Sequence, residues 1–346
     1  MASACCIMHL PATVATCANG SMLEHAYIGR RQLVAAALAA LVCKPTLAQT
    51  PLRLLCSGPP GSIPDTVARQ TARALEAQHA GDVVVDNRAG AAGRIAVQAL
   101  RVAAADGQTL LLAQGAVASI YPVLYPKLAY NATTDLQPVS LAGEMLLGLA
   151  VGPAVPDTVR SVSALLDWLR ENPAKANAGS PGAGTLPHLL QAMLFREAGV
   201  DWQHVAYAGG PPALVALLAG QITVLALPEG LLLQPHAAGR LRVLATSGAQ
   251  RSASLPGVAT LREQGLDRLV LREWFAFFAP GATPRATVSA RAEALQHALS
   301  QPALVQAFAL AGMQARGSTP AFLAQRIADE QSTWAPFLRA SGIRAE

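Results

Sequence analysis

A run of seven residues, PPGSIPD at 59–65, has the composition of a ligand-binding loop. It stands between an apolar stretch at 52–56, interpreted as a buried strand, and residues 66–80, whose apolar positions recur at helical spacing. Ser62 and Asp65 match the S-x-x-[DE] capping box that begins a helix. A capped helix start presents free N–H groups and the positive end of a dipole, which suit a carboxylate or phosphate. The alternative interpretation is an ordinary helix start after a strand.

Three further segments combine glycines with polar residues: NRAGAAG at 87–93, GSPGAGT at 179–185 and YAGGP at 207–211. Each follows an expected strand. Glycines let backbone amides approach a ligand closely. Hydroxyl groups are added by Ser180, Thr185 and Tyr207. Any one of these loops can be an ordinary turn, but several at equivalent strand ends indicate a shared binding site.

Residues 178–182, AGSPG, resemble the nucleophile elbow of a serine hydrolase, and His188 and His204 lie downstream. In that elbow the N–H of the residue after the serine helps to form the oxyanion hole. Pro181 has no N–H, so a hydrolase would lose a donor worth about 3 kcal/mol of transition-state stabilisation. A serine hydrolase is therefore a remote alternative, and we predict that the protein is not an enzyme.

The seven histidines are scattered and no H-E-x-x-H or C-x-x-C occurs, so we predict no metal site and no cofactor.

The elements that must position these loops alternate along most of the chain. Short apolar runs are followed by helical stretches, which predicts parallel sheets covered by helices. The end of the chain differs, with three expected helices at 285–300, 302–311 and 320–338. Segments 136–151 and 270–278 are expected to cross between two lobes. Ligands in open parallel sheets bind beyond the carboxyl ends of the strands, where the glycine-rich loops stand.

The first 48 residues follow the plan of a secretory signal peptide. Arg30-Arg31 precede ten apolar residues at 33–42, and small residues at 46–48 offer a cleavage site before Gln49. Ten apolar residues are too few to span a bilayer of about 30 Å, so we expect a soluble periplasmic protein. The true start could be Met22, and the twin arginines permit a twin-arginine export route.

Four of the five cysteines lie in this leader, where Cys43 weakly resembles a lipoprotein cleavage box. Only Cys56 remains, so the mature fold has no internal disulfide and must rest on its core. Cleavage after Ala48 leaves 298 of the 346 residues, enough for two lobes. Removal of the leader lowers the formal net charge from +5 to +3, which is too small to indicate nucleic-acid binding.

The order of these motifs resembles the Bug receptors, the extracytoplasmic solute-binding proteins of the tripartite tricarboxylate transporter family. The resemblance extends over nearly all of the mature chain. Seven segments in the family's order carry it: PPGSIPDxxAR at 59–69, VDNRAGAAG at 85–93, AxDGQTL at 104–110, SPGAGTLPHL at 180–189, HVAYAG at 204–209, RSASLPGVATLxExG at 251–265 and EWFAFFAP at 273–280.

The resemblance implies a type II periplasmic-binding-protein fold, in which two α/β lobes with mixed sheets close on a ligand like a Venus-flytrap. We expect lobe 1 at 49–145 plus 275–346 and lobe 2 at 146–274, joined by crossing strands. The implied ligand is a small organic acid or amino acid, whose carboxylate is held by backbone groups and ordered waters. Trp274 and its aromatic neighbours are interpreted as core at the lobe crossing.

The resemblance assigns ligand binding to eleven positions. They are Gly61, Ser62, Asp65, Gln114, Gly115, Ser180, Gly184, Thr185, His188, Tyr207 and Glu229. Asp65 is expected to act mainly on loop architecture, since a direct contact with an anion would be repulsive. His188 has two interpretations, ligand contact or bracing of a loop. Glu229 stands where the family places an acid that helps to select the ligand.

Departures from the family pattern leave the ligand open, including Tyr207-Ala208-Gly209 in place of a usual tyrosine-lysine-glycine and Ala206-Tyr207 in place of a usual proline-tyrosine pair. Ser62 replaces a glycine that the family usually has, and Thr223 stands near the position of a usual acid. The implied partners are membrane permease subunits that take up the ligand. A membrane sensor kinase is the alternative partner, because signalling needs the same closing cleft. We expect a monomer.

Overall fold

A computed structural model describes residues 50–78, 81–341 and 343. Residues 49–346 form one compact unit, the body of the protein. The expected signal peptide, with Met22, the twin arginines and Cys43, lies outside the described residues. Within the described residues, none of the helices has the length and apolar character that a bilayer crossing requires.

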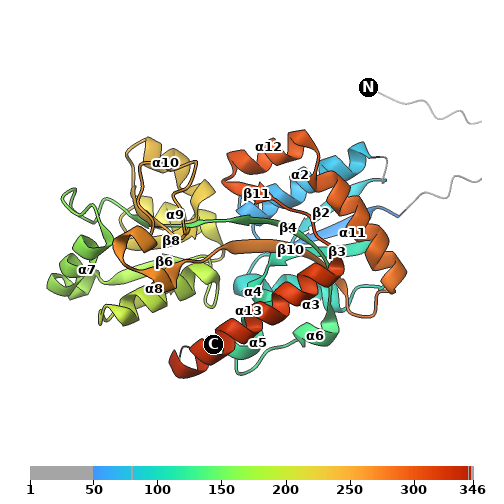
Figure 1. Cartoon of the computed structure of the whole chain (residues 1–346), viewed down its shortest axis with the longest axis horizontal. Coiled ribbons are helices and arrows are strands. Elements are labelled where there is room, and N and C mark those ends of the chain that lie inside the picture. Colours follow the sequence, from blue (N-terminus) through green and yellow to red (C-terminus); the bar gives the residue numbers. More distant parts are fainter. Residues whose placement is uncertain (1–49, 79–80, 342, 344–346) are drawn as a thin grey trace, which may run out of the picture. The chain divides into compact units, whose positions relative to one another are not determined.

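Six strands form the first sheet, in the order β11-β4-β10-β3-β1-β2 (Figure 1). The strands are β1 Leu52–Cys56, β2 Val83–Asn87, β3 Thr109–Gln114, β4 Leu136–Met145, β10 Glu273–Pro280 and β11 Met313–Ala315. β1 pairs in parallel with β2 and β3, whereas β10 is antiparallel to β3 and β4. The central strands β3 and β10 are mostly apolar because helices cover both faces of the sheet.

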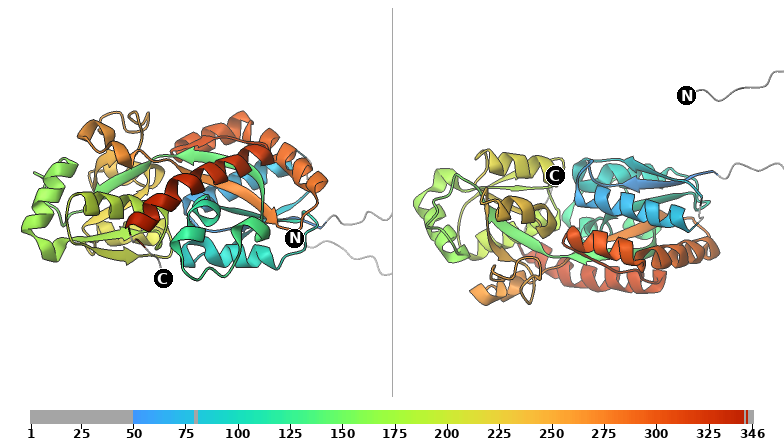
Figure 2. Two further views of the ribbon diagram at one scale, coloured as in Figure 1. Left: turned by 60° about the horizontal axis from the view of Figure 1, so that its bottom comes forward. Right: turned by 90° about the horizontal axis from the view of Figure 1, so that it is seen from above.

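The helices of this sheet divide between its faces. One face packs against α2 Ile63–Ala77, α11 Arg285–Leu299 and α12 Pro302–Leu310. The other packs against α3 Arg94–Arg101, the short α4 Ala116–Ser119 and α5 Tyr121–Leu124, and α13 Pro320–Ser341 (Figure 2). A further short helix, α6 Ala132–Asp135, precedes β4. All three C-terminal helices therefore pack on the first sheet.

Five strands form the second sheet, in the order β7-β6-β8-β5-β9. The strands are β5 Leu147–Val151, β6 Asn177–Ser180, β7 Gln203–Ala206, β8 Val224–Pro228 and β9 Arg242–Thr246. Its helices are α7 Val162–Glu171, α8 Leu186–Glu197, α9 Gly210–Leu218 and α10 Leu233–Ala237. β6 is parallel to β7 and β8, and β5 is antiparallel to β8 and β9, so this sheet is mixed as well.

Two segments join the sheets. Only Leu146 separates β4 from β5, so the chain passes from the first sheet to the second in one extended stretch. It returns through β10, whose eight residues are all buried. Below, the first and second lobes are the two sheets with their own helices. The residue bounds expected for the lobes stay a prediction.

The start of α2 shows how local sequence sets an element. The helix begins at Ile63, directly after the N-cap Ser62, and ends at Ala77. The buried face of the helix carries Val67, Ala68, Ala72 and Leu75, as their spacing predicts.

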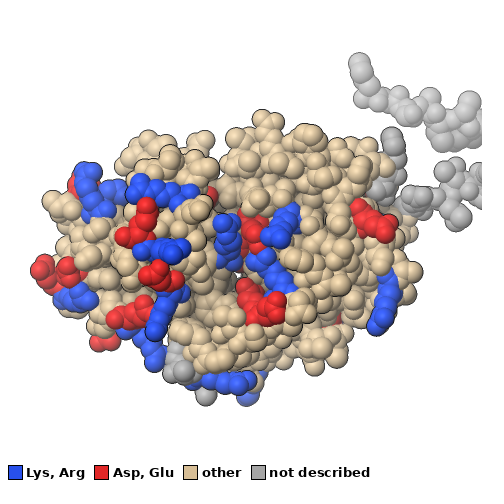
Figure 3. Space-filling view, viewed as in Figure 1, with Lys and Arg blue, Asp and Glu red and all other residues tan. Residues whose placement is uncertain are grey.

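On the outer surface, Lys and Arg side chains are interspersed with Asp and Glu across the face in Figure 3. That face carries no field of a single sign.

Candidate functional site

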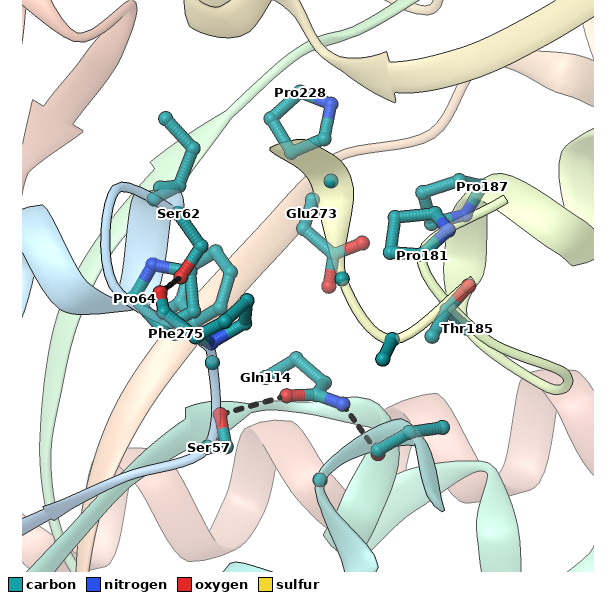
Figure 4. Close-up of a pocket in the computed structure, with 18 of the residues that line it drawn as sticks. Ser57, Ser62, Pro64, Gln114, Pro181, Thr185, Pro187, Pro228, Glu273 and Phe275 are labelled. Carbon is teal, nitrogen blue, oxygen red and sulfur yellow. Dashed lines mark hydrogen bonds between the residues drawn. The ribbon is translucent and has the colours of Figure 1, made fainter. Parts of the chain in front are cut away.

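A cavity of about 80 Å³ lies between the lobes. The first lobe contributes the β1–α2 loop, the segment before α3, the end of β3 and the start of β10. The second lobe contributes the loops that precede α8 and α9 and the end of β8 (Figure 4). The cavity therefore collects the carboxyl ends of parallel strands, as expected for open α/β sheets.

Four helices begin at the wall of this cavity. Residues at the first turn or N-cap of α2, α3, α8 and α9 line it, namely Ile63, Gly93, Thr185 and Gly210. Helix N-termini carry partial positive charge and unpaired N–H groups. No Lys or Arg is among the described residues that line the cavity. The cavity can thus receive a negative charge without a cationic side chain.

The β1–α2 loop is held by its own side chains. Ser62 Oγ accepts a hydrogen bond from the Asp65 N–H at 3.5 Å and donates to the Pro59 carbonyl at 2.6 Å. The Asp65 carboxylate accepts from the Gly61 N–H at 3.0 Å, from Arg69 at 2.9 Å and from Asn87 at 2.9 Å. In a capping box the acidic side chain accepts from the N–H of the N-cap residue, but here Asp65 accepts from the N–H of Gly61, one residue earlier. Ser62 lines the cavity, whereas Gly61 and Asp65 do not.

These bonds outweigh the burial of Asp65. Burial opposes its ionisation, but hydrogen bonds from Arg69, the Gly61 N–H and Asn87 hold the pKa of the carboxyl below its ordinary value. Asp65 is only 5% exposed. Its carboxylate therefore supports the loop by hydrogen bonds and does not line the cavity.

Gln114 ties the end of β3 to two other loops. Its Oε1 accepts from the Ser57 hydroxyl at 3.0 Å, and its Nε2 donates to the Ala92 carbonyl at 2.6 Å (Figure 4). Tyr121 donates to the same carbonyl at 2.9 Å. Ala92 has φ +53, a left-handed conformation that is unfavourable for alanine, so these bonds hold a strained loop in place. Gly115 packs against the Trp274 ring and does not line the cavity.

In the second lobe, the buried Ser180 and His188 and the half-buried His204 form a group behind the β6–α8 loop. Ser180 Oγ lies 2.8 Å from His204 Nε2, and the rings of His188 and His204 stack at 3.9 Å. His188 Nδ1 accepts the Gly184 N–H at 3.0 Å. Burial lowers the pKa of His188 to about 3 and that of His204 to about 4, so both rings are neutral at pH 7. His188 thus contacts the loop backbone, and of the β6–α8 loop candidates only Thr185 lines the cavity.

The two remaining candidates also lie off the cavity wall. Tyr207 packs beside Gly179 and does not line the cavity. Glu229 is 4% exposed, and its Oε1 accepts from the Ser252 hydroxyl at 2.8 Å, while its buried Oε2 has no partner among the described residues. Burial raises the pKa of Glu229. The residue lies where the second lobe meets Gly312, in the turn before β11 of the first lobe.

The lobes touch one another around the cavity. A Cβ placed on Gly209 would lie 2.7 Å from the Pro59 ring, and one on Gly182 would lie 3.0 Å from the Ala92 Cβ. Such approaches need residues without side chains, which explains glycines at both positions. The cleft is therefore in a closed arrangement.

Sequence reasoning missed Glu273 and Phe275 as lining residues. Both belong to the EWFAFFAP run, whose aromatic residues were interpreted as core. Trp274, Phe277 and Phe278 are indeed buried, but Phe275 and Glu273 line the cavity. The available signal was the glutamate itself, an ionisable residue at the start of an otherwise apolar buried strand.

Comparison with known proteins identifies the family. The sequence matches the family model described as tripartite tricarboxylate transporter family receptor over residues 67–343. Protein BugT of Bordetella pertussis is 33% identical over 313 residues, which cover 90% of this chain and 95% of BugT. The structure of the periplasmic binding protein BugD has a TM-score of 0.80 at 23% identity and covers 86% of this chain and 99% of BugD.

Two further solved structures contain ligands. MatC from Rhodopseudomonas palustris, with bound malate, has a TM-score of 0.76 at 26% identity and covers 83% of this chain and 98% of MatC. Another R. palustris protein, solved with adipate, has a TM-score of 0.80 at 25% identity and covers 85% of this chain and 98% of that protein. The predicted type II periplasmic-binding-protein fold is confirmed. The chain belongs to the receptor family of the tripartite tricarboxylate transporters.

Proposed function

We propose that this receptor captures a small organic carboxylate in the periplasm and delivers it to a membrane permease. The observation that carries the proposal is the cavity at which α2, α3, α8 and α9 all begin. Four helix N-termini favour an anion, and their N–H groups can satisfy carboxylate oxygens. The malate and adipate in two structures of the same fold support this ligand class.

Within the cavity we assign direct contact to Ser62, Gln114 and Thr185, which line it. The other positions named from the sequence support the loops from behind. They are Gly61, Asp65, Gly115, Ser180, Gly184, His188, Tyr207 and Glu229. Their hydrogen bonds and close packing keep the backbone donors pointed at the ligand.

The protein binds its ligand without turning it over. The contact of Ser180 Oγ with His204 Nε2 resembles a nucleophile beside its base. However, Ser180 is fully buried and does not line the cavity, so a bound acyl group could not reach it. Pro181 removes the oxyanion-hole N–H that such an elbow requires.

The test begins with the mature protein purified from a periplasm and its native mass, which reveals a co-purified solute. After removal of that solute, thermal shift and calorimetry are measured with malate, adipate, citrate, glutamate, benzoate and glucose. A ligand present at one hundred times its Kd should stabilise the folded state by about 2.7 kcal/mol. Binding of glucose alone, with no response to any acid, would overturn the proposal.

The delivery step has its own test. Deletion of the permease genes should abolish receptor-dependent uptake of the labelled acid that binds in calorimetry. If uptake persists without a permease, and transcription of a sensor-kinase target instead follows the acid, the partner is the sensor. The control for both measurements is the Gly209→Val receptor, in which closure of the cleft should be blocked. The added side chain would collide with Pro59 and oppose closure, because even a Cβ at this position would lie 2.7 Å from that ring.

A further inference from the structure

Glu273 is an acidic side chain inside the proposed anion-binding cavity. It is the first residue of β10 and pairs with Met145 of β4. Its carboxyl lies within the cavity, between the side of Pro181 and the side of Phe275 (Figure 4). The residue is only 5% exposed, and no hydrogen-bond donor among the described residues contributes to its pKa, which responds to burial and to Glu330. A buried carboxylate without donors is costly, so this group needs an explanation.

A second buried glutamate decides where the negative charge resides. Glu330 of α13 faces Glu273 electrostatically, and the two acids disfavour simultaneous ionisation. Burial raises the pKa of Glu330 as well, but contacts with Ser119, Trp274 and Arg326 oppose that rise. Glu330 accepts the Trp274 Nε1–H at 3.0 and 3.1 Å. Because Glu330 has these donors and Glu273 has none, the proton of the pair belongs on Glu273.

The other ionisable groups near Glu273 do not move the proton of the pair from Glu273 to Glu330. Tyr121 of α5 faces Glu273 and is fully buried, and burial raises its pKa well above the ordinary value, so it stays neutral. Glu144 of β4 is paired with Arg316 and Arg326. The helix N-termini favour one negative charge in the cavity, and a ligand carboxylate supplies it. Burial, followed by the field of Glu330, raises the pKa of Glu273 to about 8.

We propose that Glu273 is the specificity-determining residue of this cavity and that its neutral carboxyl donates an O–H hydrogen bond to the ligand carboxylate. This inference rests on the proposed function. With its proton, Glu273 adds a donor to a wall that lacks Lys and Arg. Without its proton it repels the ligand, since two carboxylates would share one buried site. Capture of an acid is therefore coupled to protonation of Glu273.

The direction in which ligand affinity changes with pH distinguishes a ligand carboxylate from a ligand ammonium. A ligand carboxylate requires the neutral glutamate, so affinity falls as the pH rises above the pKa of Glu273. A ligand ammonium would require the ionised glutamate, so affinity would fall as the pH drops. The observations favour the first, because Glu273 lacks any donor and faces another acid.

The experiment is titration calorimetry with malate and adipate between pH 6.5 and 9.5. Wild-type affinity should fall about 30-fold between pH 7 and pH 9.5 if the free pKa is about 8. Glu273→Gln, which keeps an N–H donor of the same shape, should bind within about threefold of the wild type at pH 7 and lose this fall. Glu293→Gln makes the same substitution at an exposed glutamate of α11 and should follow the wild-type profile.

A second measurement uses the wild type alone and does not depend on the folding of a variant. At pH 8.5, calorimetry in two buffers of different ionisation enthalpy should show uptake of about three-quarters of a proton per ligand. Proton release on binding, or identical pH profiles for wild type and Glu273→Gln, would overturn the inference while acid binding itself stands. If no acid binds the wild type at pH 6.5, the proposed function fails and this inference falls with it.

Discussion

Tyr125 of the first lobe donates a hydrogen bond to the carbonyl oxygen of Ala183 in the second lobe, at 2.5 Å. Its ring is also covered by the Arg94 guanidinium, whose carbon lies 3.9 Å from the ring centre. Ala183 belongs to the loop before α8, which borders the cavity through Pro181 and Thr185. The bond therefore links the lobes at the rim of the binding site.

The first prediction is that Tyr125→Phe weakens ligand binding more than folding. Loss of a hydrogen bond of about 0.5–1.5 kcal/mol should raise Kd roughly 2- to 12-fold, because closure loses one inter-lobe contact. Calorimetry with the acid that binds the wild type measures this. Tyr130→Phe is the matched control, since the Tyr130 hydroxyl donates to the Val117 carbonyl within the first lobe. Equal losses of affinity in both variants would contradict a role in closure.

The second prediction concerns Asp65. Asp65→Asn should lower the free energy of unfolding by about 0.5–2 kcal/mol at pH 7, because it weakens the support of the α2 start. The folded pKa is lowered, so the stability it contributes is present above the unfolded pKa of about 3.9 and is lost as the pH falls through the folded value. The difference between variant and wild type should therefore shrink below about pH 4.

Denaturant unfolding at pH 7 and pH 3 checks this prediction. Asp167→Asn, which removes an exposed ion pair with Arg170, should change stability little. If Asp65→Asn melts like the wild type yet no longer binds any acid, Asp65 contacts the ligand directly.

The third prediction is acid destabilisation through the histidine pair. Both folded pKa values are lowered, to about 3 for His188 and about 4 for His204, from an unfolded value of about 6.5. Their contribution to stability is present above about pH 6.5 and is lost as the pH falls toward about 4.

The variant His204→Gln can keep a hydrogen bond to Ser180 and should lose less stability than the wild type between pH 7 and pH 4.5. His297→Gln, on the exposed side of α11, should match the wild type in thermal melts. A wild-type melting temperature that does not change over this range would refute the neutral histidine pair.

The fourth prediction concerns Glu229, expected from the family pattern to select the ligand. It lies at the junction with Gly312 and outside the cavity wall. Glu229→Gln should therefore change the affinity for mono-, di- and tricarboxylates by a common factor. If the ratios of these affinities change more than about threefold, Glu229 does help to select the ligand. The measurement is the same acid panel, with Glu263→Gln, an exposed glutamate paired with Arg251, as control.

Local features of this protein were readable in the sequence because their partners are close along the chain. The cap of α2 joins Ser62 to Asp65, three residues apart, and both identity and spacing are visible in one loop. The order of strands, glycine-rich loops and helices likewise follows from short apolar runs and turn residues. The family's fold could thus be predicted without coordinates.

The chemistry of the cavity was decided by tertiary structure. Gln114 meets Ser57 across 57 positions, and Glu273 faces Glu330 across a similar separation. Whether Glu273 carries a proton depends on its burial and on which of the two acids receives the donors. Ser180 ends β6 and Glu229 directly follows β8, at strand ends beside the cleft, yet both are buried and neither lines the cavity. A side chain's direction and its dielectric surroundings depend on residues distant in sequence, and no local pattern encodes them.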